Sequence, residues 1–222
     1  VPRMSLAGIR VLELAAVGTG EGRPSTSSGI AVAWVAKLFG DLGADVIRVE
    51  SADGDDRVRS RPHELHRWLT TNKRSIRYRP GDAIDALVAD ADLVVHDGSW
   101  PELDPELAIA AWPRLVVLAV TPFGQTGPYR DYAAEELSVI HGSSWGFLSP
   151  SAATDIALPP LKAAGHHATI NVATAAAAAA AAAVDHATRT GQGEHIDFSM
   201  YAAAAKLTEF APAAASFLGV DA

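Results

Sequence analysis

The chain has 222 residues, of which 49% are hydrophobic and 20% charged, a composition typical of one folded globular domain rather than a disordered segment. Its net charge of −8 gives no reason to expect nucleic acid or an anionic membrane surface as a partner, although local cations and backbone amides can still bind an anionic ligand. Cysteine is absent from the sequence, which excludes disulfides, thiolate metal sites and cysteine nucleophiles.

The first part of the chain predicts a βαβ unit. Residues 8–14 are apolar at alternate and then consecutive positions, as in a strand, and the loop at 18–29 is rich in glycine and serine. A helix is predicted at 30–42, ended by Gly43, and a second strand at 45–50. This spacing implies a parallel sheet with a right-handed crossover.

The rest of the chain continues the alternation of strands and helices after a charged loop at 51–62. No internal repeat or linker interrupts it. The expected fold is therefore one α/β domain with a Rossmann-like, doubly wound and mainly parallel sheet. Further strands are predicted at 75–78, 92–96, 115–121 and 195–200, and helices at 81–89, 105–112, 135–147, 168–184 and 201–218.

Two segments bear on export and membrane insertion. Residues 1–5 have no apolar signal core, and we interpret Met4 as the natural first residue, with Val1 as a misread start codon. Residues 168–184 are mostly alanine, a weakly apolar residue and the best helix former, and the helical pattern continues into charged residues. We therefore expect a buried helix rather than a membrane span, and a cytoplasmic protein.

The glycine-rich loop invites comparison with dinucleotide-binding loops. Those loops need the spacing G-x-G-x-x-G directly before a helix, so that backbone amides meet a pyrophosphate. Gly18, Gly20 and Gly22 have the spacing G-x-G-x-G, and a serine-rich stretch separates them from the predicted helix. Glu50 ends the second strand, where an acid that binds the ribose of NAD would lie. The glycine spacing nevertheless argues against an NAD-binding site.

Two other common kinds of site have no support in the sequence. His96, His141, His166 and His167 form no H-x-x-H or H-E-x-x-H pattern with carboxylates, so no metal site is expected. Residues 142–146 resemble the G-x-S-x-G elbow of hydrolases but contain one extra residue. Neither observation indicates a catalytic site.

Five segments, taken together, resemble family III CoA transferases, the CaiB/BaiF group that includes formyl-CoA transferase and α-methylacyl-CoA racemase. Each segment is weak alone, but the five lie in that family's order and at its spacing over nearly the whole chain. They are L-A-G-I-R-V-L-E-L at 6–14, L-F-G-D-L-G-A-D-V-I-R-V-E at 38–50, N-K-R-S at 72–75, F-G-Q-T-G-P-Y at 123–129 and R-T-G-Q-G-E-H-I-D-F-S at 189–199.

The resemblance implies that residues 4–222 form the family's large, Rossmann-like domain and that subunits interlock as rings. We expect that this chain lacks the family's smaller second domain. We therefore expect a homodimer, or a hetero-oligomer with a chain that supplies the missing half. The apolar tail at 202–220 would suit burial against such a partner.

The family's transferases use a carboxylate, usually an aspartate, near the start of the helix that follows the F-G-x-x-G-P segment. The resemblance places this nucleophile on Glu136, because Glu136-Leu137 matches the family's Asp-Leu. The carboxylate would attack an acyl-CoA to give a mixed anhydride, and the freed CoA would form an enzyme-bound thioester that passes to a carboxylic acid. From the residues alone, Glu135 and Glu136 are more simply explained as acids that favour a helix N-terminus.

Two other functions remain open. The family's racemases move an α-proton with a histidine and an aspartate, and the corresponding positions hold Glu135 and His166, which could act as an acid/base pair. The chain could also be a non-catalytic subunit that binds CoA or completes an oligomer. CoA transfer is the preferred interpretation.

Coenzyme A or acyl-CoA is expected as a substrate, with no permanently bound cofactor. The resemblance places CoA contacts at Ala16 and Val17 in the first loop, and at Lys73 and Arg74, whose charges suit its phosphates. From the residues alone, Lys73 and Arg74 could equally form a solvated turn. The segments at 96–99 and 18–28 depart from the family pattern.

Overall fold

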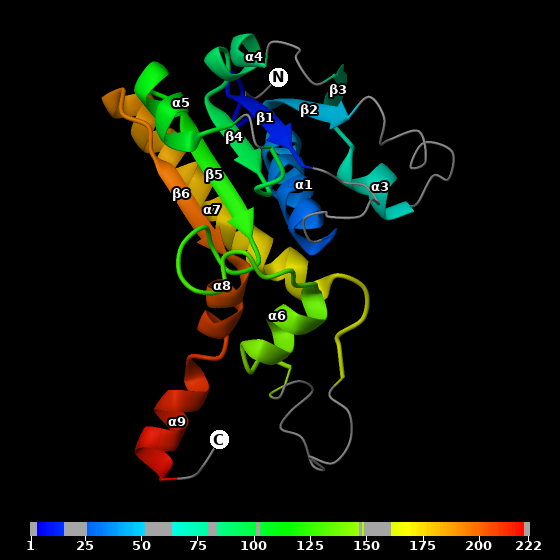
Figure 1. The fold of residues 1–222 in the computed structure, drawn as a ribbon, viewed down its shortest axis with the longest axis vertical. Helices are drawn as coiled ribbons and strands as arrows, with labels where there is room; N and C mark the ends of the chain where they lie inside the picture. Colours follow the sequence, from blue (N-terminus) through cyan, green and yellow to red (C-terminus); the bar gives the residue numbers. More distant parts are fainter. Residues whose placement is uncertain are drawn as a thin grey trace.

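Six parallel strands form one sheet in this protein, as a computed structural model shows over residues 4–15, 26–51, 64–79, 84–100, 103–146, 148 and 161–219. The strand order is β3-β2-β1-β4-β5-β6 (Figure 1), so the order reverses between β1 and β4, the switch point of a doubly wound sheet. The predicted fold class is confirmed. The strands are β1 (Arg10–Leu14), β2 (Asp45–Ser51), β3 (Lys73–Tyr78), β4 (Leu93–His96), β5 (Val116–Thr121) and β6 (His195–Ser199).

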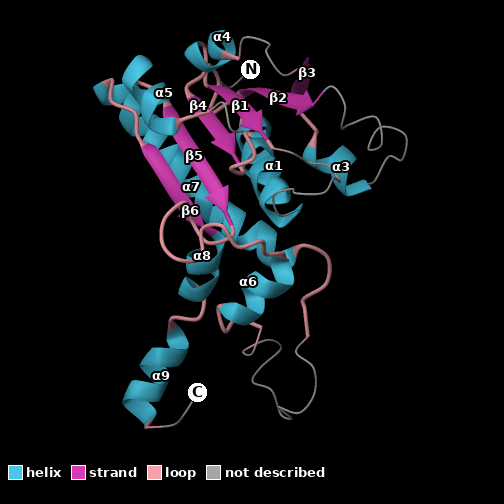
Figure 2. Cartoon of the chain, in the orientation of Figure 1, coloured by secondary structure: helices cyan, strands magenta, loops and turns pink. Residues whose placement is uncertain are grey.

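Helices cover both faces of the sheet (Figure 2). The helices α1 and α7 contribute to the core on one face, and α4 and α5 to the core on the other. The helix α3 packs against α1, whereas α6 and α8 lie beyond the carboxyl ends of β5 and β6 (Figure 1). The helices are α1 (Thr26–Asp41), α3 (Glu64–Leu69), α4 (Asp85–Ala89), α5 (Pro105–Ala111), α6 (Glu136–Gly142), α7 (His167–Thr190), α8 (Met200–Lys206) and α9 (Phe210–Leu218).

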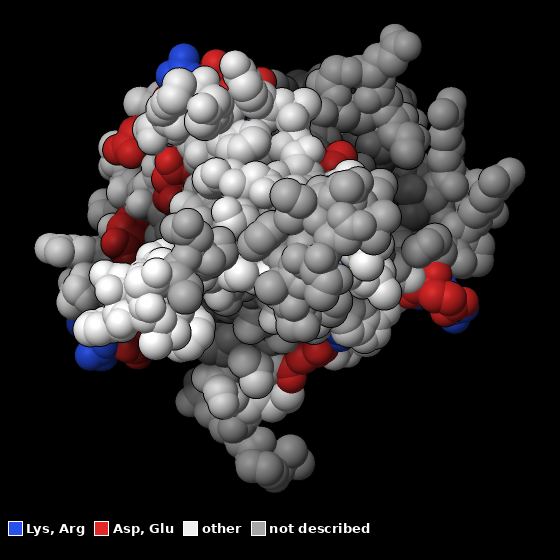
Figure 3. All heavy atoms as spheres, turned by 90° about the horizontal axis from the view of Figure 1, so that it is seen from below, with Lys and Arg blue, Asp and Glu red and all other residues white. Residues whose placement is uncertain are grey.

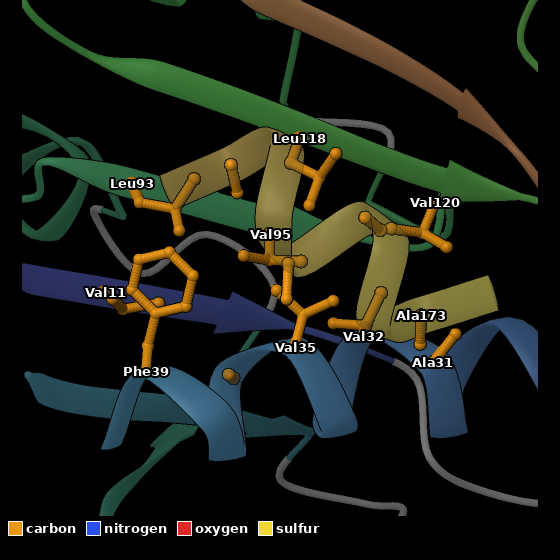
Figure 4. Packing of buried hydrophobic residues seen from close by; sticks show 14 of the residues in the cluster. Val11, Ala31, Val32, Val35, Phe39, Leu93, Val95, Leu118, Val120 and Ala173 are labelled. Atoms are coloured by element: carbon orange, nitrogen blue, oxygen red, sulfur yellow. The ribbon is translucent and has the colours of Figure 1, made fainter. Parts of the chain in front are cut away.

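The strands β4 and β5 are buried along their whole length, which explains why their sequences are almost unbroken apolar runs. On one face, Val35 and Phe39 of α1 pack toward Val11 of β1 and Val95 of β4 (Figure 4). Such close packing fixes the position of α1 relative to β1 and β4. It therefore holds the carboxyl ends of β1 and β4 beside the start of α1.

The alanine-rich helix α7 is a core helix, as the sequence predicts. By length and composition it could cross a membrane, yet 50% of its most apolar stretch is buried inside the protein. Ala173 lies beside Ala31 and Val32 of α1 (Figure 4), and alanine side chains let the two helices approach closely. Gly191 follows the helix with a left-handed backbone, φ 79°.

The helix α1 begins earlier than predicted, at Thr26 rather than at residue 30. Its first turn needs acceptors for backbone N–H groups that have no partner within the helix. The side chain of Glu135, from a distant part of the chain, accepts the N–H of Ser27. This contact stabilises a first turn that sequence patterns do not indicate.

Three further features of the helices differ from those predicted. The helix α6 ends at Gly142 rather than at residue 147, and Ser144 just beyond it has a positive φ of 66°. The short helix α3 was not predicted, and it packs through Trp68, which stacks on Trp34 of α1. The predicted tail helix is two helices, α8 and α9.

Within the described ranges, no element packs on α9 closely enough to bury any of its residues. Phe210, Phe217 and Leu218 are 71–90% exposed. Figure 3 views the molecule from this end, and its described surface carries scattered acidic side chains among large uncharged areas. A helix with this many exposed apolar side chains fits the expectation that the tail is covered by another part of a larger assembly.

A network of charged side chains is buried between the sheet and α1. Lys73 Nζ lies 2.6 Å from Glu13 Oε2 and 2.7 Å from the carbonyl oxygen of Ala33. Arg48 lies 3.5 Å from Glu13 Oε1 and 3.7 Å from Glu50 Oε1. Burial lowers the pKa of Lys73 below its usual value, while the Glu13 carboxylate opposes this shift. Each buried charge therefore has an opposite charge beside it.

Glu13→Gln is expected to lower the free energy of unfolding by about 3–5 kcal/mol, because it leaves the Lys73 ammonium buried without its closest charged partner. Urea unfolding followed by circular dichroism measures this change. Asp185→Asn removes an exposed ion pair with Arg189 and serves as the control, with an expected change below about 1 kcal/mol. Equal effects of the two variants would contradict a special role of burial.

His96 ends β4 with a side chain enclosed by the protein, since the residue is only 2% exposed. Its Nδ1 atom accepts the N–H of Gly98 at 3.2 Å, which assigns the proton of the neutral ring to Nε2. Burial, with a smaller effect of His195, lowers the pKa of His96 to about 4. The neutral imidazole is therefore the form that this position favours.

Acid should destabilise the protein through His96. The unfolded state, with a histidine pKa near 6.5, binds a proton that the folded state takes up only near pH 4, so the free energy of unfolding falls by roughly 3 kcal/mol between these values. Urea unfolding over this pH range measures the loss, which His96→Asn should remove. His186→Asn, at an exposed position on α7, should keep it. The same pH dependence in wild type and His96→Asn would refute the assignment.

Candidate active site

The loop between β5 and α6 carries the segment F-G-Q-T-G-P-Y and ends at Glu135 and Glu136. Asp197 of β6 accepts the N–H of Gln125 with both carboxylate oxygens, at 2.9 and 3.0 Å. Gly124 has a φ of 84°, a conformation that favours glycine. Asp197 belongs to the segment H-I-D-F-S, so two of the family-like segments meet here and hold the start of the loop.

Glu135 and Ser27 join the start of α6 to the start of α1. Glu135 Oε2 accepts the N–H of Ser27 at 3.3 Å and the Ser27 hydroxyl at 3.0 Å. The Ser27 hydroxyl oxygen in turn accepts the N–H of Glu136 at 2.8 Å. Ser27 is 3% exposed, whereas Glu135 is an exposed residue. The hydroxyl thus places the backbone of Glu136 relative to α1.

Glu136 presents its carboxylate to the start of α7. Its Oε1 atom accepts the N–H of Thr169 at 3.0 Å. Thr169 lies in the first turn of α7, where backbone N–H groups have no partner within the helix and the helix dipole favours a negative charge. Since the Glu136 side chain is 4% exposed, this is a buried carboxylate with a defined orientation.

Two side chains from the segment before α7 flank the other carboxylate oxygen. Lys162 Nζ lies 2.9 Å from Glu136 Oε2, and His166 Nδ1 lies 3.6 Å from the same atom. These side chains are 33% and 34% exposed, so the carboxylate is approached by solvent-accessible groups from this direction. We define the Glu136 cluster as Ser27, Glu135, Glu136, Lys162, His166 and Thr169.

The Glu136 cluster is suited to hold an anionic nucleophile. A backbone N–H on one oxygen and an ammonium on the other stabilise a negative charge at a defined place. A carboxylate in such a place can attack an electrophilic carbonyl. In the ranges that the structure describes, no three side chains of the metal-binding types lie close enough together to hold a metal ion.

Lys73 and Arg74, two of the four predicted CoA contacts, have their ion-pair partners outside this cluster. Ala16 and Val17 lie outside the described residues. Lys73 is paired with Glu13 in the buried network, while Arg74 is exposed and forms an ion pair at the sheet edge. Lys73 and Arg74 both line a cavity of about 260 Å³ together with side chains of β2 and α3. CoA binding there stays a prediction.

The segment at 96–99, which departs from the family pattern, forms a turn at the carboxyl end of β4. Asp97 is buried and accepts both the N–H of Ser99, at 3.0 Å, and the Ser99 hydroxyl. Such side-chain contacts are typical of turns that begin with aspartate. The Asp97 carboxylate and the Ser99 hydroxyl therefore form hydrogen bonds within the turn.

The two residues predicted for racemisation are placed differently from each other. His166 lies beside Glu136, whereas Glu135 binds Ser27. Sequence reasoning also missed three members of the cluster. No local sequence signal indicates Ser27, Lys162 or Thr169, because their contacts with Glu136 are tertiary.

Similarity to known proteins decides the family. Residues 6–220 match the model of CoA-transferase family III. This chain belongs to that family. The predicted resemblance is thereby confirmed. The matched residues include the Glu136 cluster, and the family is named for the transfer of CoA.

Among curated proteins, the chain is 33% identical over 218 residues to the succinate–glutarate CoA-transferase of Agrobacterium fabrum, covering 88% of this chain and 50% of that protein. It is 29% identical over 224 residues to the succinyl-CoA–L-malate CoA-transferase beta subunit of Chloroflexus aurantiacus, covering 89% and 49%. The chain thus spans about half the length of these relatives.

A solved structure of a CaiB/BaiF family protein from Brucella suis is also similar to this chain. The TM-score is 0.80 at 26% identity, and the match covers 100% of this chain and 60% of that one. The sheet and its flanking helices are therefore those of CoA-transferase family III.

Ser27→Ala is expected to lower the free energy of unfolding by about 1–3 kcal/mol, because the buried N–H of Glu136 loses its acceptor. Urea unfolding measures the change. Ser138→Ala is the matched control, since Ser138 is an exposed position of α6, and it should alter the free energy by no more than about 0.5 kcal/mol. If Ser27→Ala is as stable as this control, the hydroxyl does not join α1 to α6.

Proposed function

We propose that this chain carries the nucleophile of an acyl-CoA:carboxylate CoA-transferase and that Glu136 is that nucleophile. The observation that supports this most is the environment of its carboxylate, which is 4% exposed, hydrogen-bonded to Thr169 and flanked by Lys162. A carboxylate that served only to start α6 would have no need of these partners from the segment around the start of α7.

Glu135 is less suited to the role of nucleophile. Both the N–H and the hydroxyl of Ser27 donate to its Oε2 atom, so this side chain acts as an acceptor for the first turn of α1. The two neighbouring acids thereby divide two tasks. Glu135 connects helices, and Glu136 offers a buried carboxylate for chemistry.

The proposed reaction begins with attack of a Glu136 carboxylate oxygen on the thioester carbonyl of an acyl-CoA. The carbon–sulfur bond breaks, which gives a mixed anhydride and CoA thiolate. The thiolate then attacks the Glu136 carbonyl of the anhydride, releasing the first carboxylic acid as its anion and leaving CoA bound to Glu136 as a thioester. The acceptor acid reverses these steps and leaves as its CoA ester.

We propose succinyl-CoA as the donor and a dicarboxylic acid as the acceptor, because the relatives from Agrobacterium fabrum and Chloroflexus aurantiacus are named for succinate, glutarate and L-malate. We also propose a cytoplasmic dimer or hetero-oligomer, because one of these relatives is named as a beta subunit. Ala16, Val17, Lys73 and Arg74 remain the predicted contacts for CoA.

Racemisation is the second candidate, and one contact favours keeping it. His166 Nδ1 lies 3.6 Å from Glu136 Oε2, so an imidazole and a carboxylate are close enough to share the handling of a proton. This pair differs from the Glu135 and His166 predicted from the sequence. A non-catalytic role in an assembly is the third candidate.

Glu136→Gln is expected to slow formation of the enzyme-bound CoA thioester by more than about 10³-fold, because an amide is a far weaker nucleophile than a carboxylate. The protein is incubated with succinyl-CoA and treated with hydroxylamine, which converts a glutamyl thioester into a hydroxamate. Mass spectrometry of the peptide that contains residue 136 then measures the hydroxamate.

Glu135→Gln is the matched control and should still form the hydroxamate at residue 136. A hydroxamate on another residue, or an undiminished yield in Glu136→Gln, would contradict the proposal. Incorporation of deuterium from solvent at the α-carbon, without CoA exchange, would instead establish the racemase. If neither reaction occurs, the non-catalytic role stands.

A further inference from the structure

One negative charge is conserved through each proposed step at Glu136. It lies first on the Glu136 carboxylate. After attack on the acyl-CoA it lies on the CoA thiolate, while Glu136 becomes a neutral anhydride. After the thiolate attacks the Glu136 carbonyl it lies on the released carboxylate, while Glu136 becomes a neutral thioester. A cation held beside Glu136 therefore meets an anion at every stage of the transfer.

Lys162 has the geometry of such a cation. An ammonium has three N–H donors. In Lys162, the carbonyl oxygens of Ala163, at 3.1 Å, and Gly165 accept hydrogen bonds from it, and Glu136 Oε2 lies 2.9 Å away. Two hydrogen-bond acceptors thus belong to the loop that carries the lysine, and the carboxylate that reacts is its ion-pair partner.

The other three lysines of the chain have acidic partners elsewhere. Lys37 pairs with Asp41, Lys73 with Glu13 and Lys206 with Glu209. Within the described ranges, Lys162 is the only lysine or arginine within ion-pair distance of Glu136. Its side chain is 33% exposed, so an anion that arrives from solvent can reach it, unlike the buried Lys73.

Acylation of Glu136 removes the negative charge of the ion-pair partner of Lys162. The two loop carbonyls still hold the ammonium in place, because they take no part in the reaction. The ammonium is left without an anionic partner at the moment when the thiolate is released. A preorganised donor of this kind stabilises the new anion without a movement of the protein.

We infer that Lys162 is the counterion that follows the charge through the reaction, binding in turn the Glu136 carboxylate, the CoA thiolate and the departing or arriving carboxylate. This role rests on the proposed CoA transfer at Glu136. It keeps each anion beside the neutral acyl group that it must attack and opposes its loss to solvent. Lys162 thereby contributes to the rate of each exchange rather than to the affinity for acyl-CoA.

Lys162→Ala tests this role in the protein as it is isolated. With succinyl-CoA as the probe, kcat for CoA transfer and the single-turnover rate of hydroxamate formation at Glu136 should fall about 100-fold, with little change in KM. Ethylammonium added to Lys162→Ala should restore part of the rate, because it supplies both charge and N–H donors. Tetramethylammonium, which has the charge but no N–H, should not.

Lys206→Ala, which removes an exposed lysine from the end of α8, is the control and should leave kcat unchanged. Thermal unfolding checks that Lys162→Ala is folded. If it is not, Lys162→Arg takes its place, and it should retain transfer because it keeps a cationic donor.

The possible results separate the two proposals. If wild type forms no adduct at Glu136, both the proposed function and the role of Lys162 fail. If wild type forms the adduct and Lys162→Ala forms it equally fast, the role of Lys162 alone fails. The same holds if Lys162→Ala is slow and neither ammonium ion restores the rate, because that result identifies a structural lysine. Loss of transfer in a folded Lys162→Arg would also overturn the role.

Discussion

All six strands of the sheet run in the same direction, and this constraint brings the starts of the helices to one edge. Each helix that returns across the sheet must begin where a strand ends, so unpaired backbone N–H groups collect there. At this edge the first turns of α1, α6 and α7 come together. Ser27, Glu136 and Thr169 join them through two hydrogen bonds, and the Glu136 carboxylate occupies the point where they meet.

Charged side chains serve two different purposes in this fold. The buried carboxylates of Glu13 and Glu50 balance the charges of Arg48 and Lys73, and these ion pairs connect β1, β2 and β3. Lys162 and Glu136 are likewise opposite charges in contact, but one of them is partly open to solvent and the other is held by a helix start. The first group is suited to stay paired, and the second pair can exchange one partner for a ligand.

The strands and the fold class were predictable because a parallel sheet covered on both faces requires apolar runs at βαβ spacing. The neighbouring segment made it predictable that Glu136 lies near the start of a helix. Its contacts with Ser27 and Lys162 were not predictable, because these residues come from distant segments and local sequence patterns do not indicate tertiary contacts. The same reason explains the missed helix α3, whose stacking of Trp68 on Trp34 of α1 is a tertiary contact.

The alanine face of α7 has a consequence for how this protein can vary. Ala176 and Ala180 are 0% exposed and belong to the core cluster that also contains residues of α1 and the sheet. A larger side chain at either position would push α7 outward. A displaced helix would carry Thr169 away from Glu136. The small alanine side chains therefore keep α7 close to the sheet, and this position brings the N–H of Thr169 to the Glu136 carboxylate. The size of the side chain allowed at these core positions is thus limited by the geometry of a hydrogen bond further along the helix.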